Sequence, residues 1–114
     1  MGLDQYAGTF TEPLDTKFQW RKHAKLQKYF EDIWYERNTH EFNCEYLILR
    51  KSDVVELKRL VEKDLMPQSE GGFFYGHEFQ KESAEEYKQQ DLDFCNWAIE
   101  QIDNGNEVAY RCWY

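Results

Sequence analysis

The sequence predicts an α+β fold, a small and mainly antiparallel sheet of about three strands covered by three helices. Three observations lead to this class. Short aromatic segments lie near both ends of the chain, and a short apolar segment lies before its middle, as expected for strands. Longer segments between them repeat their apolar residues at the helical period. Strand, helix, strand, helix, loop, helix and strand therefore follow one another, and in 114 residues we expect them to form a single domain, 1–114.

The first third of the chain predicts a strand and then a helix. Leu3–Phe10 is short and aromatic, and because Gly2 and Pro13 flank it we expect an edge strand. Thr16–Trp34 has the helical period, since at about 100° per residue its apolar side chains gather on one arc and its basic side chains on the other. That apolar arc consists of Trp20, Ala24, Leu26, Tyr29, Phe30, Ile33 and Trp34.

The middle third predicts a second strand and a second helix after a polar connection, Asn38–Asn43. Glu45–Arg50 carries four consecutive apolar side chains, so both of its faces are apolar and we expect a central strand. Ser52 or Asp53 is expected to cap the following helix, which ends before Pro67. The apolar stripe of this helix consists of Val54, Leu57, Val61 and Leu65.

The last third predicts the longest helix. Met66–Gln80 is an irregular segment, and Ser83–Asn104 follows it as a helix that opens on Ser with Glu three residues later, the spacing of a capping box. Gly105 is expected to end this helix in the left-handed conformation. Glu107–Tyr114 alternates weakly and is rich in aromatic residues, so we expect a last strand.

Composition and charge exclude some classes of function. Aromatic residues make up 18% of the chain and are expected to supply much of the core. The formal net charge is -8; residues 1–61 hold 10 basic and 10 acidic side chains, whereas residues 62–114 hold 4 and 12. General nucleic-acid binders carry a basic face, so direct nucleic-acid binding is not expected. An acidic face that imitates a phosphate backbone and occupies the DNA site of another protein stays open as an alternative.

Cysteine usage and the missing motifs narrow the remaining classes. Cys44, Cys95 and Cys112 are too few for a disulfide framework, which indicates a reducing compartment. Without an apolar N-terminal signal or a membrane-spanning run, we expect a soluble, cytoplasmic protein. Phosphate loops, nucleophile elbows and zinc-protease motifs are absent. His40 with Cys44 is too small a set for a structural zinc, so neither a metal nor a cofactor is expected.

Asp91 is the most informative residue, because it falls inside the apolar arc of the predicted third helix. Burying a carboxylate without partners costs several kcal/mol, so the fold must supply donors or raise its pKa. In a structural interpretation, Asp91 accepts backbone N–H groups from the glycine-rich loop or pairs with an arginine. In a functional one, it is an acid or base on the floor of a pocket closed by Phe73, Phe74 and Tyr75.

Two further patterns would be unusual in a purely apolar core. Gln19, His23 and Gln27 recur every four residues among apolar side chains, so they either hydrogen-bond to neighbouring backbone or line a ligand cleft. Gly71–Gly76 encloses three consecutive aromatic residues between glycines. Those rings either fill the core, or Tyr75 and one Phe stay partly exposed as a contact patch.

Several sequence motifs together resemble those of a small uncharacterised family encoded largely by phages and bacteria. They are Met1–Asp4, Trp20–Lys22, Met66–Ser69, Gly72–Gly76, Tyr87, Asp91, Tyr110 and Cys112–Trp113. The resemblance spans nearly the whole chain and implies a phage-type accessory protein without assigning its chemistry. Gln27 stands where the family has His, Ala24 stands where it has Asn, and Glu70-Gly71 is inserted before the aromatic loop, so the resemblance does not carry over chemistry that needs that His.

These observations favour a noncatalytic binding module that uses the aromatic loop and the acidic C-terminal half to bind a host or viral protein. The alternative is a small-ligand binder or minor enzyme with a pocket around Asp91, Arg21 and the aromatic loop. No membrane partner is expected, and self-association is left open. The candidate site residues are Asp4, Trp20, Arg21, Lys22, Gln68, Phe73, Phe74, Tyr75 and Asp91.

Overall fold

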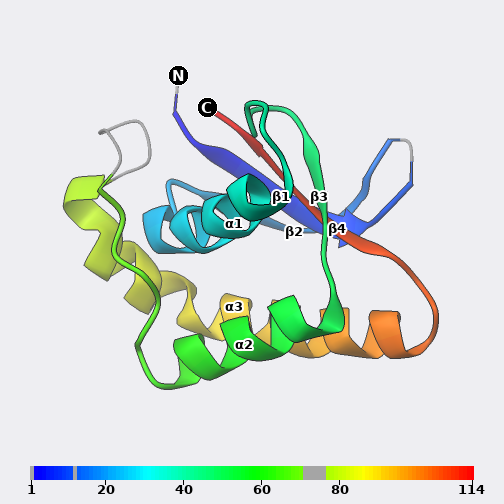
Figure 1. Ribbon diagram of the computed structural model, residues 1–114. Helices are drawn as coiled ribbons and strands as arrows, with labels where there is room; N and C mark the ends of the chain where they lie inside the picture. The colour runs from blue at the N-terminus through cyan, green and yellow to red at the C-terminus, as the bar shows by residue number, and fades with distance from the viewer. Residues whose placement is uncertain (1, 12, 71–76) are drawn as a thin grey trace.

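One antiparallel sheet and three α-helices make up the part of the chain that the computed structural model describes, residues 2–11, 13–70 and 77–114 (Figure 1). In chain order the elements are β1 (Asp4–Thr9), β2 (Asp15–Arg21), α1 (Ala24–Arg37), β3 (Tyr46–Ile48), α2 (Lys51–Glu62), the 3-10 helix η2 (His77–Phe79), α3 (Gln80–Asp103) and β4 (Val108–Trp113). The strand order is β2-β1-β4-β3, and every neighbouring pair is antiparallel. The predicted α+β class is confirmed, with four strands where the sequence suggested about three.

The helices cover one face of the sheet. Phe30 of α1 packs on Tyr110 of β4 with ring centroids 4.1 Å apart, and Phe94 of α3 packs edge-on against Trp20 of β2 at 5.4 Å. Trp20 and Tyr110 lie on the same face, because Trp20 is opposite Gln5, Gln5 is opposite Cys112, and residues two apart share a face. α2 packs on α3. No helix of the described residues covers the opposite face.

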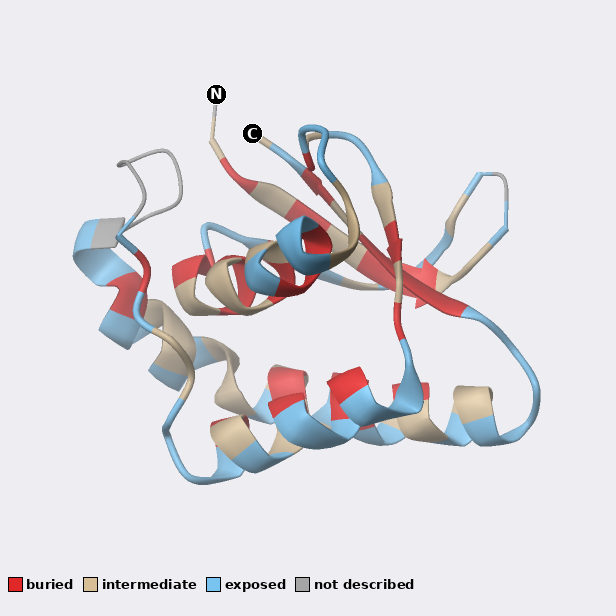
Figure 2. Ribbon diagram, in the orientation of Figure 1, coloured by how far each residue is buried: buried red, intermediate tan, exposed pale blue. Residues whose placement is uncertain are grey.

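Aromatic side chains fill the space between the sheet and the helices, as the composition predicts. Five of the largest fully buried side chains are aromatic: Trp20, Phe30, Phe42, Phe94 and Tyr110. Figure 2 shows the buried positions of α2 and α3 on the side that faces the sheet and α1, and exposed positions on the outer side. The acidic side chains of the C-terminal half therefore lie mostly on the outer surface of α3 and around its ends.

The prediction of one helix over Thr16–Trp34 is wrong in its first part, which is strand β2. Phe18 and Trp20 turn toward the helices while Lys17 and Gln19 are exposed, an alternation with the period of a strand. Apolar residues two apart also fit a helical arc when several neighbours are apolar, so the sequence period alone did not separate the two. β2 pairs with β1 along the whole length of β1, which shows that this segment is a strand.

The two sheet positions assigned from sequence are also wrong. Leu3–Phe10 was expected at an edge, yet β1 lies inside the sheet, between β2 and β4. Glu45–Arg50 was expected at the centre, yet β3 is a three-residue edge strand. Its outer-face residue Tyr46 is covered by Phe10, with ring centroids 5.5 Å apart, and by the Arg111 guanidinium, 5.2 Å from its ring centroid. An edge strand with both faces covered therefore has the apolar pattern of a central one.

Helix starts differ from the capping predictions, whereas one helix end agrees. α2 begins earlier than expected, and the Asp53 carboxylate accepts the Arg50 backbone N–H at 2.8 Å, so Asp53 lies in the first turn and neither it nor Ser52 is the cap. α3 begins three residues before Ser83. Gly105 has φ +87° and closes α3 as predicted. Leu65, assigned to the apolar stripe, lies beyond α2 and is exposed.

Candidate functional site

Three buried side chains meet where β2, α1 and α3 come together. Asp91 accepts a hydrogen bond from the indole Nε1–H of Trp20 on Oδ1 at 2.8 Å. Its Oδ2 lies 2.7 Å from Nε2 of His23. The Asp91 and His23 side chains have no exposed surface, and Trp20 is 1% exposed. We call these three residues the Asp91 cluster.

A turn between β2 and α1 brings His23 into this cluster. Lys22 adopts a left-handed conformation, φ 54°, and its N–H donates to the Leu3 carbonyl at 2.8 Å, so the chain turns away from the direction of β2 at this residue. His23 then precedes the first turn of α1 with its side chain directed inward. Gln5 fixes the backbone of His23, since its Oε1 accepts the His23 N–H at 2.9 Å and its Nε2 donates to the His23 carbonyl at 3.1 Å.

Burial dominates the electrostatics of the Asp91 cluster. Burial raises the pKa of Asp91 above its ordinary value of 3.8, and the hydrogen bonds from His23 and Trp20 offset part of that rise. The Tyr87 ring stacks on the His23 imidazole with centroids 5.3 Å apart. With the ring proton on Nε2, His23 donates to Asp91, and its buried Nδ1 is an acceptor that has no hydrogen-bond partner within residues 2–11, 13–70 and 77–114.

A chain of buried polar groups continues from the cluster across the sheet. Gln5 donates to the Tyr110 hydroxyl at 2.9 Å, and that hydroxyl donates to Gln27 Oε1. Gln27 in turn donates to the Cys112 sulfur at 3.3 Å. Gln5 and Tyr110 were not among the predicted site residues. Gln5 shares the buried face of β1 with Leu3 and Ala7, and a lone Gln on such a face is a weak signal in the sequence.

The predicted polar row on a helix is only partly correct. Gln27 and His23 are fully buried, as a structural role requires, but among the described residues their side chains hydrogen-bond to the side chains of Cys112 and Asp91 and not to neighbouring backbone. Gln19, however, lies in β2 and is exposed, and only its backbone carbonyl contacts α3, as acceptor of Gln90 Nε2 at 2.7 Å. The structure therefore does not place the three residues on one face.

Of the nine predicted site residues, the structure joins Trp20 and Asp91 directly. Asp91 points inward as predicted, and its hydrogen-bond partners among the described residues are Trp20 and His23, not an arginine; the glycine-rich loop at 71–76, the other expected partner, lies outside the described residues. Phe73, Phe74 and Tyr75 lie outside the described residues, so the expected pocket wall has no structural description.

The remaining predicted site residues lie at the surface. Asp4 and Arg21 face each other across β1 and β2 with a 3.9 Å ion-pair distance, and the Arg21 side chain is 71% exposed. Lys22 and Gln68 are exposed. The structure therefore separates the exposed Arg21 guanidinium from the buried Asp91 carboxylate.

Two hydrogen bonds join Gln80, the first residue of α3, to the backbone of Ser69. The Gln80 amide oxygen accepts the Ser69 N–H at 2.7 Å, and its amide nitrogen donates to the Ser69 carbonyl at 3.2 Å. Both residues are buried. One side chain thus holds both backbone groups of Ser69, in the manner of a strand partner, and fixes residues 69 and 80 beside each other.

The described residues offer little reactive or metal-binding chemistry. Burial raises the pKa of the Cys95 and Cys112 thiols to about 12, whereas Cys44 is exposed. Within 2–11, 13–70 and 77–114, no three His, Cys, Asp or Glu side chains are grouped to hold a metal ion. In the same ranges, every helix is too short or too polar to cross a bilayer.

Comparison with protein-family models, with curated proteins and with solved structures gave no match for this chain. The site is therefore interpreted from its own geometry. The Asp91 cluster is buried, and both oxygens of its carboxylate have hydrogen-bond partners. Such a cluster holds β2, α1 and α3 together. Contacts with other molecules are therefore sought on the surface beside it.

Proposed function

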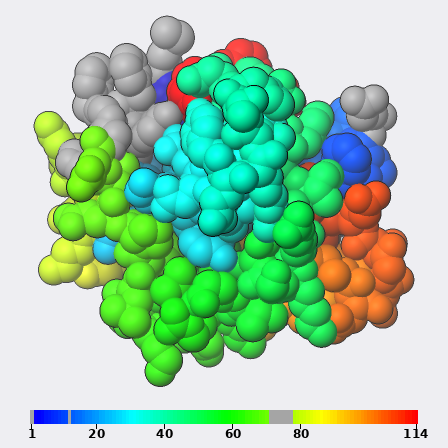
Figure 3. All heavy atoms as spheres, viewed as in Figure 1, coloured from blue at the N-terminus to red at the C-terminus, as the bar shows by residue number. Residues whose placement is uncertain are grey.

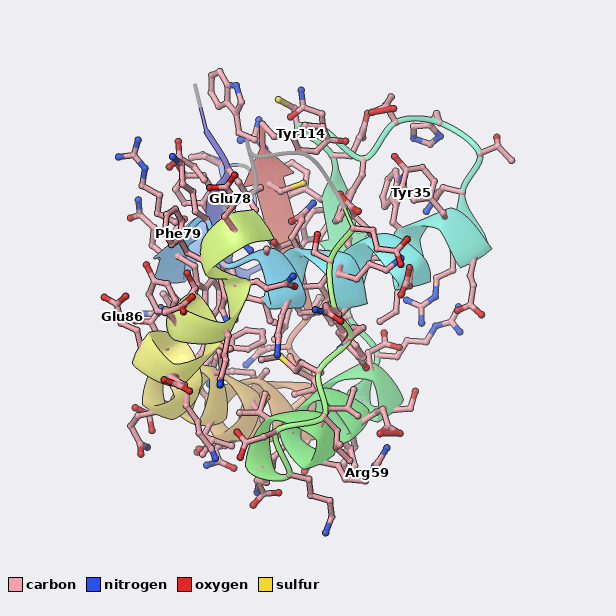
Figure 4. The ribbon with its side chains drawn as sticks, turned by 90° about the vertical axis from the view of Figure 1, so that its left-hand side faces the viewer. Tyr35, Arg59, Glu78, Phe79, Glu86 and Tyr114 are labelled. Carbon is pink, nitrogen blue, oxygen red and sulfur yellow. The ribbon has the colours of Figure 1, made fainter. Side chains whose placement is uncertain are left out.

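We propose that the protein is a noncatalytic protein-binding module with its contact surface at the start of α3. Phe79 exposes 63% of its surface there. Glu78, Glu82 and Glu86 are exposed around it at helical spacing, and Figure 4 shows Glu78, Phe79 and Glu86 on one side of the molecule. We call these four residues the Phe79 patch. Aromatic side chains are enriched in protein contact sites, which have a polar rim.

The observation that carries this proposal is the rigid support of an exposed ring. Gln80, the next residue, is 7% exposed and is held by two hydrogen bonds to Ser69, so the backbone beside Phe79 is fixed. A side chain carried on a fixed backbone loses less conformational entropy on binding than one on a mobile backbone. Aromatic residues of this kind are frequent among the few that dominate binding energy.

The charge of the patch indicates the chemistry of the partner. Three carboxylates surround Phe79, and residues 62–114 hold 12 acidic against 4 basic side chains. A complementary partner presents an apolar socket with a rim of Lys or Arg, and its association rate falls as salt rises. The resemblance to a phage and bacterial family supports a phage-type accessory role, with a bacterial or phage protein as partner. The aromatic residues Phe73, Phe74 and Tyr75 precede the patch in sequence, and we include them in the proposed contact.

Site-specific photocrosslinking tests this function. Benzoylphenylalanine replaces Phe79 in one sample and Tyr35, which is 47% exposed on α1, in the control. In a bacterial lysate we expect one dominant adduct from position 79, weakened by high salt and by reversing the charges of the rim (Glu82→Lys with Glu86→Lys). The same adducts from both positions, or no adduct from position 79, would contradict the proposal.

A small-ligand site is the second candidate, and one observation favours it. In a carboxylate–imidazole pair, the carboxylate orients the ring and leaves the second nitrogen to act as base or acceptor. Nδ1 of His23 is such a nitrogen, since it is buried and has no hydrogen-bond partner in the part of the chain that the structure describes. If this site binds a ligand, a thermal-shift screen of small polar metabolites should find a compound that stabilises the wild type and not Asp91→Asn. If the screen finds no such compound, the small-ligand site is contradicted and only the protein-binding role remains.

A further inference from the structure

β3 leaves backbone hydrogen-bonding groups free at the edge of the sheet. In the described part of the chain β3 pairs only with β4, with Leu47 opposite Tyr110 and Ile48 opposite Ala109. One position further, the Leu49 N–H donates to the Val108 carbonyl at 2.9 Å. Antiparallel pairs alternate between bonded and non-bonded positions, so Leu47 also bonds toward β4 and Ile48 points its groups away from β4.

The same alternation directs the backbone of Tyr46 outward. One outward group is already used, since Arg37 Nη1 of α1 donates to the Ile48 carbonyl at 3.5 Å. The N–H and carbonyl of Tyr46 and the N–H of Ile48 have no backbone partner among the described residues. An unpaired edge of this kind is a template for an additional strand.

A groove of about 370 Å³ lies between this edge and the C-terminal end of α1. Trp34 and Leu47, both nearly buried, form its apolar part. The indole of Trp34 is held by its hydrogen bond to the His40 carbonyl at 2.7 Å, so the groove has a fixed wall. Figure 3 shows α1 and the chain from 38 to 50 beside each other on the viewed face. The groove is separate from the Phe79 patch and does not depend on it.

The charge of the groove is opposite to that of the protein. The charged side chains that line it are Arg37 and Arg50, with His40 beside them and no carboxylate among the described lining residues, in a chain of net charge -8. Arg37 is partly neutralised by Asp53 at 2.7 Å. Arg50 is exposed and has no ion pair among the described residues, and His40 is exposed beside it. Cations around an unpaired strand edge select an acidic segment.

We propose that β3 and this groove bind an extended acidic segment of a partner protein as a fifth strand. The backbone of that segment pairs with Tyr46 and Ile48. Because side chains alternate along a strand, one set of its residues packs on Trp34 and Leu47, and acidic side chains reach Arg50 and His40. An acidic, alternating sequence is therefore the recognition feature.

A synthetic peptide of alternating Glu and Val, capped at both ends, is the probe. In an NMR titration of the full chain we expect shifts at Tyr46 and Ile48 and slower exchange of their amide protons. The same peptide with N-methylated backbone amides, and a Lys-Val peptide, should not bind. Binding of the methylated peptide equal to that of the parent would show charge attraction without strand pairing and would overturn the proposal.

Two variants test the protein side of the groove. Arg50→Ser removes a cation and leaves a good helix cap, so we expect intact folding and about threefold weaker peptide binding. Arg59→Ser removes an exposed arginine elsewhere on α2 and should leave binding unchanged. Equal effects of both would overturn the proposal. Dimerisation of the wild type that Arg50→Ser reverses would also overturn it, because a second copy would then occupy the groove.

Discussion

Replacing Asp91 by alanine should destabilise the fold more than any other single carboxylate substitution on α3. The change removes the acceptor of two buried donors, Trp20 Nε1–H and His23 Nε2–H. Each buried donor left unpaired costs about 1–3 kcal/mol, so two losses amount to about 2–6 kcal/mol. We expect a loss of about 4 kcal/mol, the middle of this range. Domains of this size unfold with about 5–15 kcal/mol, so the loss is a large share of the total.

Urea unfolding followed by tryptophan fluorescence and circular dichroism measures this loss. Asp93→Ala is the matched control, because it removes the same side chain from an exposed position on the same helix. Asp91→Asn should cost less than alanine, about 1–2 kcal/mol, since the amide still accepts from Trp20 and can donate to His23. An Asp91→Ala loss no larger than that of Asp93→Ala would refute the assignment of Asp91 as a buried support.

The same variants give the pH dependence. Burial raises the pKa of folded Asp91 above 3.8, so from that pH up to the raised pKa the folded chain binds this proton more than the unfolded chain does. Stability contributed by the protonated carboxyl is therefore full below 3.8 and is lost as pH rises through the raised pKa. The unfolding free energy of the wild type minus that of Asp91→Asn should fall with rising pH. A difference that grows with pH would contradict the raised pKa.

Two further predictions concern the cysteines and the glycines. In native protein, a thiol reagent should label Cys44 quickly, whereas Cys95 and Cys112, with pKa values of about 12, should react only on unfolding; rapid labelling of all three would show that the core is open. Gly8→Ala should cost about 3 kcal/mol because its Cβ would lie 1.9 Å from a carbonyl oxygen of the facing strand. Gly105→Ala, at φ +87° in open space, should cost about 1 kcal/mol, and equal losses in urea unfolding would contradict the close strand approach.

The helical phase of α3 could be predicted from sequence because its apolar residues repeat over many turns. That repeat placed Asp91 on the buried face, and the structure confirms this. Gly105 was likewise predictable, since the end of a long helix needs a left-handed residue. Local signals of this kind depend only on neighbours in the chain.

The partners of Asp91 could not be predicted, because they lie far away in sequence. Trp20 is 71 residues distant and His23 is 68. Because Trp20 was assigned to a helix, its position in β2, and with it the contact with Asp91, was not predicted. Sheet order was wrong for a related reason: the neighbours of a strand are set by long-range pairing, and the apolar pattern of β3 reports coverage by other elements, not its place in the sheet.

Hydrogen exchange of the tryptophan indoles tests the buried Asp91 cluster most directly. The Trp20 indole proton is bonded to a carboxylate with no exposed surface, whereas Trp113 is 59% exposed. We expect the Trp20 proton to exchange only through global unfolding, with a protection that matches the unfolding free energy, and the Trp113 proton to exchange freely. If the Trp20 proton exchanged as fast as the Trp113 proton, the Asp91 cluster would not be closed and hydrogen-bonded, which would contradict this account.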